Sequence, residues 1–130
     1  MNASDRKAVR TEKAPKALGP YSVAVQLGDL VFASGQAGID PLTNELVPGG
    51  IEPETRQVLT NLMNVLEAAG SRMENVVKTT VFLTNMAEFS KMNAIYGEFF
   101  RENFPARSTV QVSALPKGAV VEIECIAVKS

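Results

Sequence analysis

A strand that is apolar on both of its faces sets the first limit on this fold. The segment 120–128 is rich in β-branched residues, which favour strands. Alternate side chains of a strand point to opposite faces of its sheet. One face would carry Val121, Ile123, Cys125 and Ala127, and the other Val120, Glu122, Glu124, Ile126 and Val128. Both faces of the sheet that contains this strand must therefore be buried against other parts of the structure.

The N-terminal half predicts a β-hairpin, a loop and a helix. Residues 21–27 and 30–36 have the pattern of two strands joined by a tight turn. Residues 40–50 are rich in Pro, Gly and Asn, which indicates a surface loop. Pro53 fits the first position of a helix whose apolar residues recur every three or four positions, and Gly70 predicts its end.

The C-terminal half repeats the order of strand, helix and strand. Residues 76–83 are β-branched and predict a strand. Asn85 predicts the N-terminal cap of a second amphipathic helix over 89–100, which must end before Pro105. Residues 108–113 predict one more strand ahead of the C-terminal strand described above.

The predicted sheet has more apolar surface than two helices can cover. In the first hairpin Val31 and Ala33 face away from Leu30 and Phe32, so both faces are apolar there too. Two helices cover only one face of such a sheet. Exposed apolar surface of this size usually marks an interface, which predicts that the other face meets further copies of the chain.

Residue types exclude several classes of function. The chain has 130 residues, no histidine and one cysteine, Cys125, so nucleophilic schemes and zinc sites that depend on histidine are absent. Thirteen Lys and Arg against fourteen Asp and Glu give a net charge of −1, which does not favour nucleic acid. No apolar run reaches the length of a membrane span. We expect one domain over 1–130, with residues 1–10 as a flexible arm, and a cytoplasmic location, with a mitochondrial or nuclear pool as the alternative.

Arg107 is the first candidate for chemistry. It follows Pro105 and precedes a predicted strand, a position where sites are common. Its guanidinium is always charged and presents a fork of N–H donors that suits a carboxylate. The alternatives are an exposed surface arginine and a structural ion pair.

Glu122 is the second candidate. A carboxylate on a largely apolar strand face is costly to bury, and burial would raise its pKa and suit it to accept a proton from water. The alternatives are a solvated edge position and an ion pair with Lys78 or Lys117. Glu124 shares this face, and the pattern does not choose between the two glutamates.

Several other residues have two readings each. Tyr21 provides either a pocket wall or a turn anchor, and Ser34 and Gly35 either contact a ligand or mark a bulge. Asn93 either reaches a ligand or lies on a solvated helix face. Cys125 belongs to the apolar set and is expected in the core.

Together these residues resemble the RidA family, also called YjgF, in the form of its animal-type members. The motifs lie in order between residues 11 and 129 and are 19–22 (GPYS), 34–36 (SGQ), 68–70 (AAG), 77–81 (VKTTV), 105–112 (PARSTVQV), 115–118 (LPKG) and 121–124 (VEIE).

The resemblance implies a fold, an assembly and an activity. The fold would be α+β, chorismate-mutase-like, with a six-stranded mixed sheet and two helices on one face, assembled as a homotrimer with clefts between subunits. The activity would be hydrolysis of 2-imino or enamine acids, such as 2-iminopropanoate and 2-iminobutanoate, to 2-keto acids and ammonia without metal or cofactor. Arg107 and Glu122 would be catalytic, and the substrate-binding positions would be Tyr21, Ser34, Gly35, Asn93 and Thr109.

Thr109 departs from the family pattern, in which many members have Cys. The family uses this position largely through its main chain, so the substitution excludes a thiol role but not the activity. The alternative functions are an endoribonuclease that inhibits translation, with RNA as partner, and a non-catalytic ligand-binding or holdase-like trimer.

Overall fold

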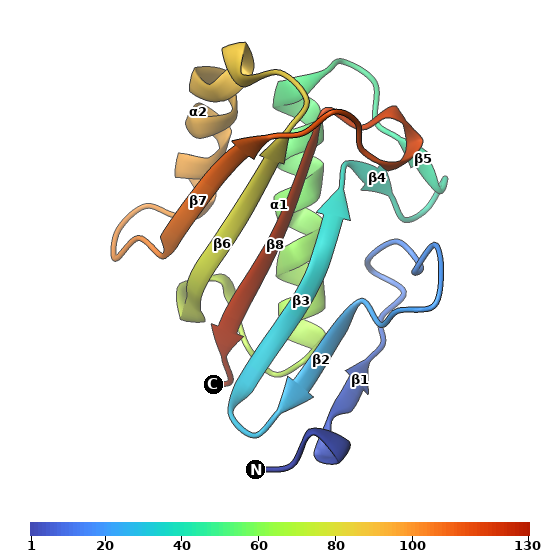
Figure 1. Ribbon diagram of the computed structural model, residues 1–130, viewed down its shortest axis with the longest axis vertical. Helices are drawn as coiled ribbons and strands as arrows, with labels where there is room; N and C mark the ends of the chain where they lie inside the picture. Colours follow the sequence, from blue (N-terminus) through green and yellow to red (C-terminus); the bar gives the residue numbers. More distant parts are fainter.

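The computed structural model describes residues 1–130 and contains one six-stranded sheet (Figure 1). Its order is β1-β2-β3-β8-β6-β7, and β6 and β7 alone pair in parallel. The strands are β1 (Lys7–Val9), β2 (Ala24–Leu27), β3 (Leu30–Ala37), β6 (Val76–Leu83), β7 (Ala106–Gln111) and β8 (Val121–Val128). A separate two-stranded hairpin is formed by β4 (Ile39–Asp40) and β5 (Glu45–Leu46).

Two helices lie on one face of the sheet (Figure 1). Helix α1 (Ile51–Ala68) packs against β3 and β8, and α2 (Phe89–Phe99) packs against α1 near the β6–β7 edge. Short 3₁₀ turns occupy Ala3–Asp5, Met73–Asn75, Met86–Glu88 and Pro116–Gly118. Neither helix combines the length and the hydrophobicity that crossing a bilayer requires. The expected α+β fold, with a mixed sheet and both helices on one side, is confirmed.

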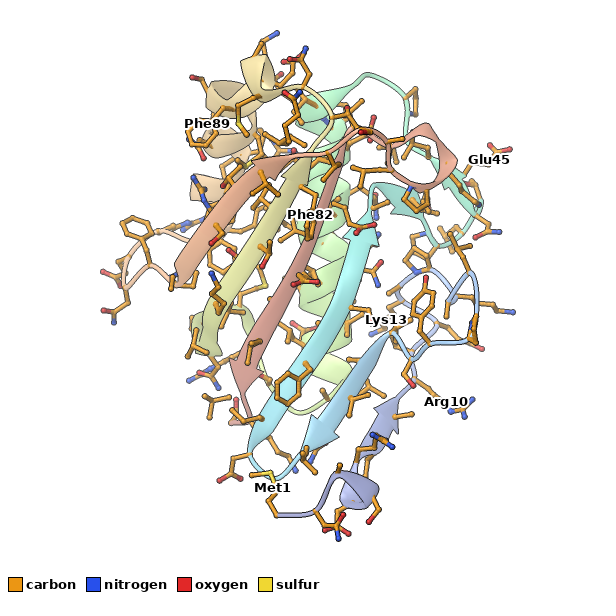
Figure 2. The ribbon with its side chains drawn as sticks, in the orientation of Figure 1. Met1, Arg10, Lys13, Glu45, Phe82 and Phe89 are labelled. Carbon is orange, nitrogen blue, oxygen red and sulfur yellow. The ribbon has the colours of Figure 1, made fainter.

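The two faces of β8 differ as the alternation predicts. Its first set of side chains, including Val121 and Ile123, is fully buried beneath the helices. The opposite face of the sheet is open and bears exposed apolar side chains at Phe32, Val110 and Val128. Phe82 lies on this open face in Figure 2. The structure therefore leaves one apolar face of the sheet uncovered by the chain itself.

Several boundaries differ from the sequence expectation. Helix α1 begins at Ile51 and has Pro53 in its third position, where a missing N–H costs no helical hydrogen bond. Gly70 ends the helix with φ of 79°, as predicted. The expected loop over 40–50 contains most of the β4–β5 hairpin, and Lys7–Val9 forms an edge strand that the sequence did not predict. Strand β7 begins at Ala106, so Arg107 lies within it.

Candidate active site

Arg107 lies on β7 with its side chain on the helix-covered face of the sheet. It is in register with Thr79 of β6, whose buried hydroxyl contacts α2. The guanidinium carbon lies 4.7 Å from the centre of the Tyr96 ring and 5.5 Å from that of Phe89. Both distances are within the range of a cation–π interaction. The cation is thus held against aromatic rings of α2, at the sheet edge where Figure 2 shows Phe89.

No carboxylate of the chain pairs with Arg107. The three ion pairs of the structure are Arg56–Glu98, Arg72–Glu74 and Lys91–Glu88. The alternative of a structural ion pair at Arg107 is therefore not realised in this chain, and the half-buried side chain is not a fully exposed surface arginine either. Its N–H fork remains available to an anion from outside the chain.

Arg107 lines an open pocket of about 330 Å³. Besides Arg107 it is lined by Asn93, Tyr96, Gly97, Phe100, Phe104 and Pro105. The side-chain oxygen of Asn93 is buried and has no hydrogen-bond partner, which is unusual for a buried polar atom. Thr109 lies two residues further along the same strand face and does not line the pocket. The pocket therefore combines a cation with largely apolar walls, and a buried acceptor without a partner belongs to one of its lining residues.

Glu122 lies on the opposite face of the sheet. It is in register with Ala37 of β3 and Phe82 of β6, and its side chain is half-buried. Burial raises the pKa of the Glu122 carboxyl, and the charge of nearby Glu124 raises it further. A carboxyl with a raised pKa is a better proton acceptor and donor near neutral pH than an ordinary one. Glu124 itself is exposed.

Gly35 allows the Glu122 carboxylate to lie against the backbone of β3. The register between β3 and β8 shifts between Ala33 and Gln36, which is the bulge that a glycine in a strand can mark. A β-carbon on Gly35 would lie 2.6 Å from Oε2 of Glu122. Only glycine at position 35 allows the Glu122 carboxylate to occupy its observed position.

Tyr21 lies near the same carboxylate, whereas Ser34 does not line its cavity, and both hydroxyl groups are engaged in hydrogen bonds with the backbone. The Tyr21 hydroxyl accepts a hydrogen bond of 3.1 Å from the Leu18 backbone N–H, and the Ser34 hydroxyl donates one of 2.7 Å to the Ser22 carbonyl. A small cavity of about 40 Å³ is lined by Tyr21, Gly35 and Glu122 together with Lys16 and other residues. The Tyr21 ring remains half exposed, so it forms a wall of this cavity.

The predicted site residues thus form two separate groups within one chain. Arg107 and Asn93 lie on the helix side near β7, whereas Glu122 and Gly35 lie on the far side of β6 and on the open face. Because the two side chains of Arg107 and Glu122 point to opposite faces of one sheet, a single chain does not bring them together.

Sequence reasoning missed the residues that support Arg107. Phe89 and Tyr96 were predicted only as members of an apolar helical stripe, and Thr79 only as part of a strand. Tyr96 and Thr79 are buried, and their hydroxyl oxygens lie 2.7 Å apart. Because Tyr96 is on a helix and Thr79 is on a strand, no sequence pattern predicts that they pair, and only the three-dimensional structure shows the contact.

Cys125 is buried as expected, and burial raises the pKa of its thiol to about 12. No cluster of three or more acidic or cysteine side chains suited to a metal ion is present.

The family comparison covers nearly the whole chain. A family model described as endoribonuclease L-PSP matches residues 11–129. A Bos taurus protein named 2-iminobutanoate/2-iminopropanoate deaminase is 50% identical over 129 residues, which are 99% of this chain and 94% of the relative. A Homo sapiens protein of the same name is 46% identical, with the same shares covered.

Solved structures agree in fold as well as in sequence. RidA from an Antarctic Psychrobacter is 45% identical with a TM-score of 0.91, and the match covers 94% of this chain and 98% of that one. E. coli TdcF, solved with bound serine, is 42% identical with a TM-score of 0.91 over 95% of this chain and 99% of that one. Sequence and fold therefore match the same group of proteins.

Proposed function

The chain belongs to the RidA (YjgF) family, the family of the endoribonuclease L-PSP model, and on this basis we propose that it hydrolyses 2-imino acids to 2-keto acids and ammonia. The substrates are small imino acids such as 2-iminopropanoate and 2-iminobutanoate, the compounds in the names of the bovine and human relatives. The observation that carries the proposal is the Arg107 guanidinium, held over aromatic rings in an open pocket without a carboxylate partner.

The chemistry needs orientation and one proton relay. Arg107 binds the substrate carboxylate through two parallel hydrogen bonds and so places the neighbouring imine carbon. Glu122 accepts a proton from a water molecule as its oxygen bonds to that carbon. Glu122 returns this proton to the nitrogen of the resulting carbinolamine and then accepts the proton of its hydroxyl group. The carbon–oxygen double bond forms as the carbon–nitrogen bond breaks, and ammonia and the 2-keto acid leave. A protonated imine is already electrophilic, so this route uses neither a metal nor a cofactor.

A complete site on this proposal needs two subunits. Arg107 of one subunit lies opposite Glu122, Gly35, Tyr21 and Ser34 of the next in a homotrimer with three such clefts. The support is the separation of the two residue groups within one chain and the exposed apolar face at Phe32, Val110 and Val128. A ring of identical head-to-tail contacts closes such an assembly. TdcF with bound serine is a relative that holds a carboxylate-bearing ligand.

Ammonia release from a freshly formed imine tests the activity. An amino-acid oxidase generates 2-iminobutanoate in the presence of a competing amine trap, and the wild type is compared with Arg107→Ala. We expect the wild type to release 2-oxobutanoate and ammonia faster than water alone, and Arg107→Ala to lose nearly all of this rate. Retained turnover in the variant contradicts the role of Arg107.

The same preparations separate the two alternatives. The family description names an endoribonuclease, and cleavage of RNA that survives stringent purification and is lost in Arg107→Ala supports that activity. Binding of 2-oxobutanoate without ammonia release supports a non-catalytic ligand-binding trimer. A cytoplasmic location is part of the proposal and is tested by fractionation of cells that express the chain.

A further inference from the structure

We propose that Tyr96 and Thr79 are positioning residues that hold the Arg107 guanidinium against the Tyr96 ring while leaving N–H donors of its fork for the substrate carboxylate. The inference rests on the proposed function, because it concerns the same carboxylate site. It assigns a purpose to a buried pair of hydroxyl groups that the proposed mechanism does not use.

The hydrogen bond between the Tyr96 and Thr79 hydroxyl groups fixes the position of the Tyr96 ring. Thr79 is completely buried on β6 and Tyr96 is 6% exposed on α2, and their oxygens lie 2.7 Å apart. Thr79 is also the register partner of Arg107 on the neighbouring strand. One hydrogen bond therefore ties α2 to β6 at the level of Arg107. A buried hydroxyl without a partner is costly, so each group keeps the other in place.

The support is compatible with substrate binding because of its geometry. The cation–π contact places the guanidinium carbon over the face of the Tyr96 ring, 4.7 Å from its centre. A carboxylate ligand uses the N–H groups at the edge of the same plane. An acidic side chain would have held Arg107 through those N–H groups and so competed with the substrate. The Tyr96 ring carries no negative charge, and even with its hydroxyl near Arg107 most of the five N–H donors of the guanidinium remain for the substrate.

The ionisation of Tyr96 supports the same picture. Burial raises the pKa of the Tyr96 hydroxyl, and the hydrogen bond with Thr79, the charge of Arg107 and a hydrogen bond with Arg107 only partly oppose this effect. Tyr96 thus stays neutral, and the positive charge of Arg107 is not cancelled by a phenolate. The full charge remains for the substrate carboxylate.

Paired substitutions separate positioning from stability. Thr79→Val and Tyr96→Phe each leave one buried hydroxyl unpaired, whereas the double variant removes both. We expect the double variant to regain thermal stability relative to either single variant, yet to keep a KM for 2-iminobutanoate raised by about three- to tenfold with a smaller change in kcat. Thr60→Val is the matched control, because its hydroxyl bonds only the Arg56 carbonyl on the exposed side of α1.

A binding measurement isolates the contribution of Arg107. Calorimetric titration with 2-oxobutanoate uses the carboxylate alone and does not depend on turnover. We expect Tyr96→Leu to weaken this binding by about tenfold in the wild-type chain and to have no further effect in Arg107→Ala. The inference is overturned if Thr79→Val/Tyr96→Phe binds 2-oxobutanoate as tightly as the wild type. It is also overturned if Tyr96→Leu weakens this binding equally in the wild-type chain and in Arg107→Ala.

The titration also distinguishes the two proposals from each other. A wild type that binds 2-oxobutanoate through Arg107 and releases no ammonia contradicts the hydrolytic activity and leaves the positioning role supported. A wild type that does not bind the carboxylate at all overturns both.

Discussion

Gly35 lies so close to Glu122 that a β-carbon in its place would be 2.6 Å from Oε2 and 2.8 Å from Cδ of the carboxyl group. The contact joins β3 and β8 at the bulge that follows Ala33. The observed position of Glu122, the proposed proton acceptor, thus depends on the absence of a side chain at Gly35.

Gly35→Ala is expected to impair turnover more than folding. The new methyl group displaces the flexible end of Glu122 rather than backbone, so the chain should still fold. Displacement of a proton acceptor by about an ångström can lower a rate by up to about a hundredfold, and we expect kcat to fall by between tenfold and that limit. Steady-state kinetics with 2-iminobutanoate, beside circular dichroism, measures both effects.

Gly97→Ala is the comparison for Gly35→Ala, because it adds the same methyl group beside Arg107 instead of beside Glu122. A β-carbon at Gly97 meets no atom within 4 Å, and this residue lies inside α2, where it lines the Arg107 pocket. Alanine in a helix interior is more favourable than glycine by about 1 kcal/mol, so this variant should be slightly more stable, and any loss of activity should fall on KM and not on kcat. Equal losses of kcat in both alanine variants would contradict a specific effect on Glu122.

The acid limb of the pH–rate profile should belong to Glu122. Its carboxyl must be ionised to accept a proton, so kcat/KM should fall as the pH drops through the raised pKa of Glu122. Glu124→Gln removes the like charge that contributes to this raised pKa, so the limb should move to lower pH. Glu67→Gln, on the far end of α1, should leave it in place. An unmoved limb in Glu124→Gln would assign it to another group.

Local patterns in the sequence predicted the elements well because local physics determines them. β-branched residues at 76–83 gave the bounds of β6, and the alternation at Val121 and Ile123 gave the buried face of β8. The edge strand at Lys7–Val9 was missed because three mixed residues have no periodicity. Its strand structure comes from pairing with β2, which is a tertiary contact.

The candidate site was harder, because its geometry depends on long-range contacts. Arg107 and Glu122 were chosen by residue type and resemblance, but their placement on opposite faces follows only from register with Thr79 and Phe82. The cation–π contact between Tyr96 and Arg107 joins a helix to a strand, and no spacing rule predicts it. The Tyr21 hydroxyl accepts a hydrogen bond from the nearby Leu18 N–H, which is the structural interpretation that the sequence left open for Tyr21. The Ser34 hydroxyl instead bonds the Ser22 carbonyl, twelve residues earlier in the chain.

Glu54 allows a separate prediction about stability. It is buried in the first turns of α1 and accepts a 2.9 Å hydrogen bond from the Val120 N–H. Burial raises its pKa more than this bond lowers it. For a carboxyl whose folded pKa is raised, the stabilisation is complete below the unfolded pKa and is lost as the pH rises through the folded value.

Glu54→Gln should therefore stabilise the protein at pH 7 and have little effect at pH 4, because the amide keeps an oxygen for Val120 without a buried charge. Thermal unfolding at a fixed protein concentration measures the difference in melting temperature at the two pH values. A stabilisation that is larger at pH 4 would reverse the sign of the proposed linkage.

Replacement of Arg107 should separate charge from geometry. Arg107→Lys keeps the positive charge but loses the planar fork and the stacking on Tyr96, so kcat/KM should fall by about tenfold. Arg107→Ala loses both charge-assisted hydrogen bonds, and the fall should be about a hundredfold or more. Arg72→Ala, in an exposed ion pair with Glu74, is the control that should retain activity. Equal activity of the lysine and wild-type proteins would rule out bidentate binding.

Mixed oligomers test whether Arg107 and Glu122 act across a subunit boundary. Arg107→Ala and Glu122→Gln are each expected to be inactive, yet a site between one chain of each kind can combine an intact arginine with an intact glutamate. Random association of equal amounts should restore about one quarter of the wild-type sites, since each half of a site is intact with even odds. Co-refolding Arg107→Ala with Arg107→Ala/Glu122→Gln cannot restore any site and gives the background. If the first mixture shows only this background activity, Arg107 and Glu122 do not act across a subunit boundary. Their side chains point to opposite faces of the sheet and so cannot act together within one chain. That result would therefore exclude a mechanism in which Arg107 and Glu122 act on the same substrate.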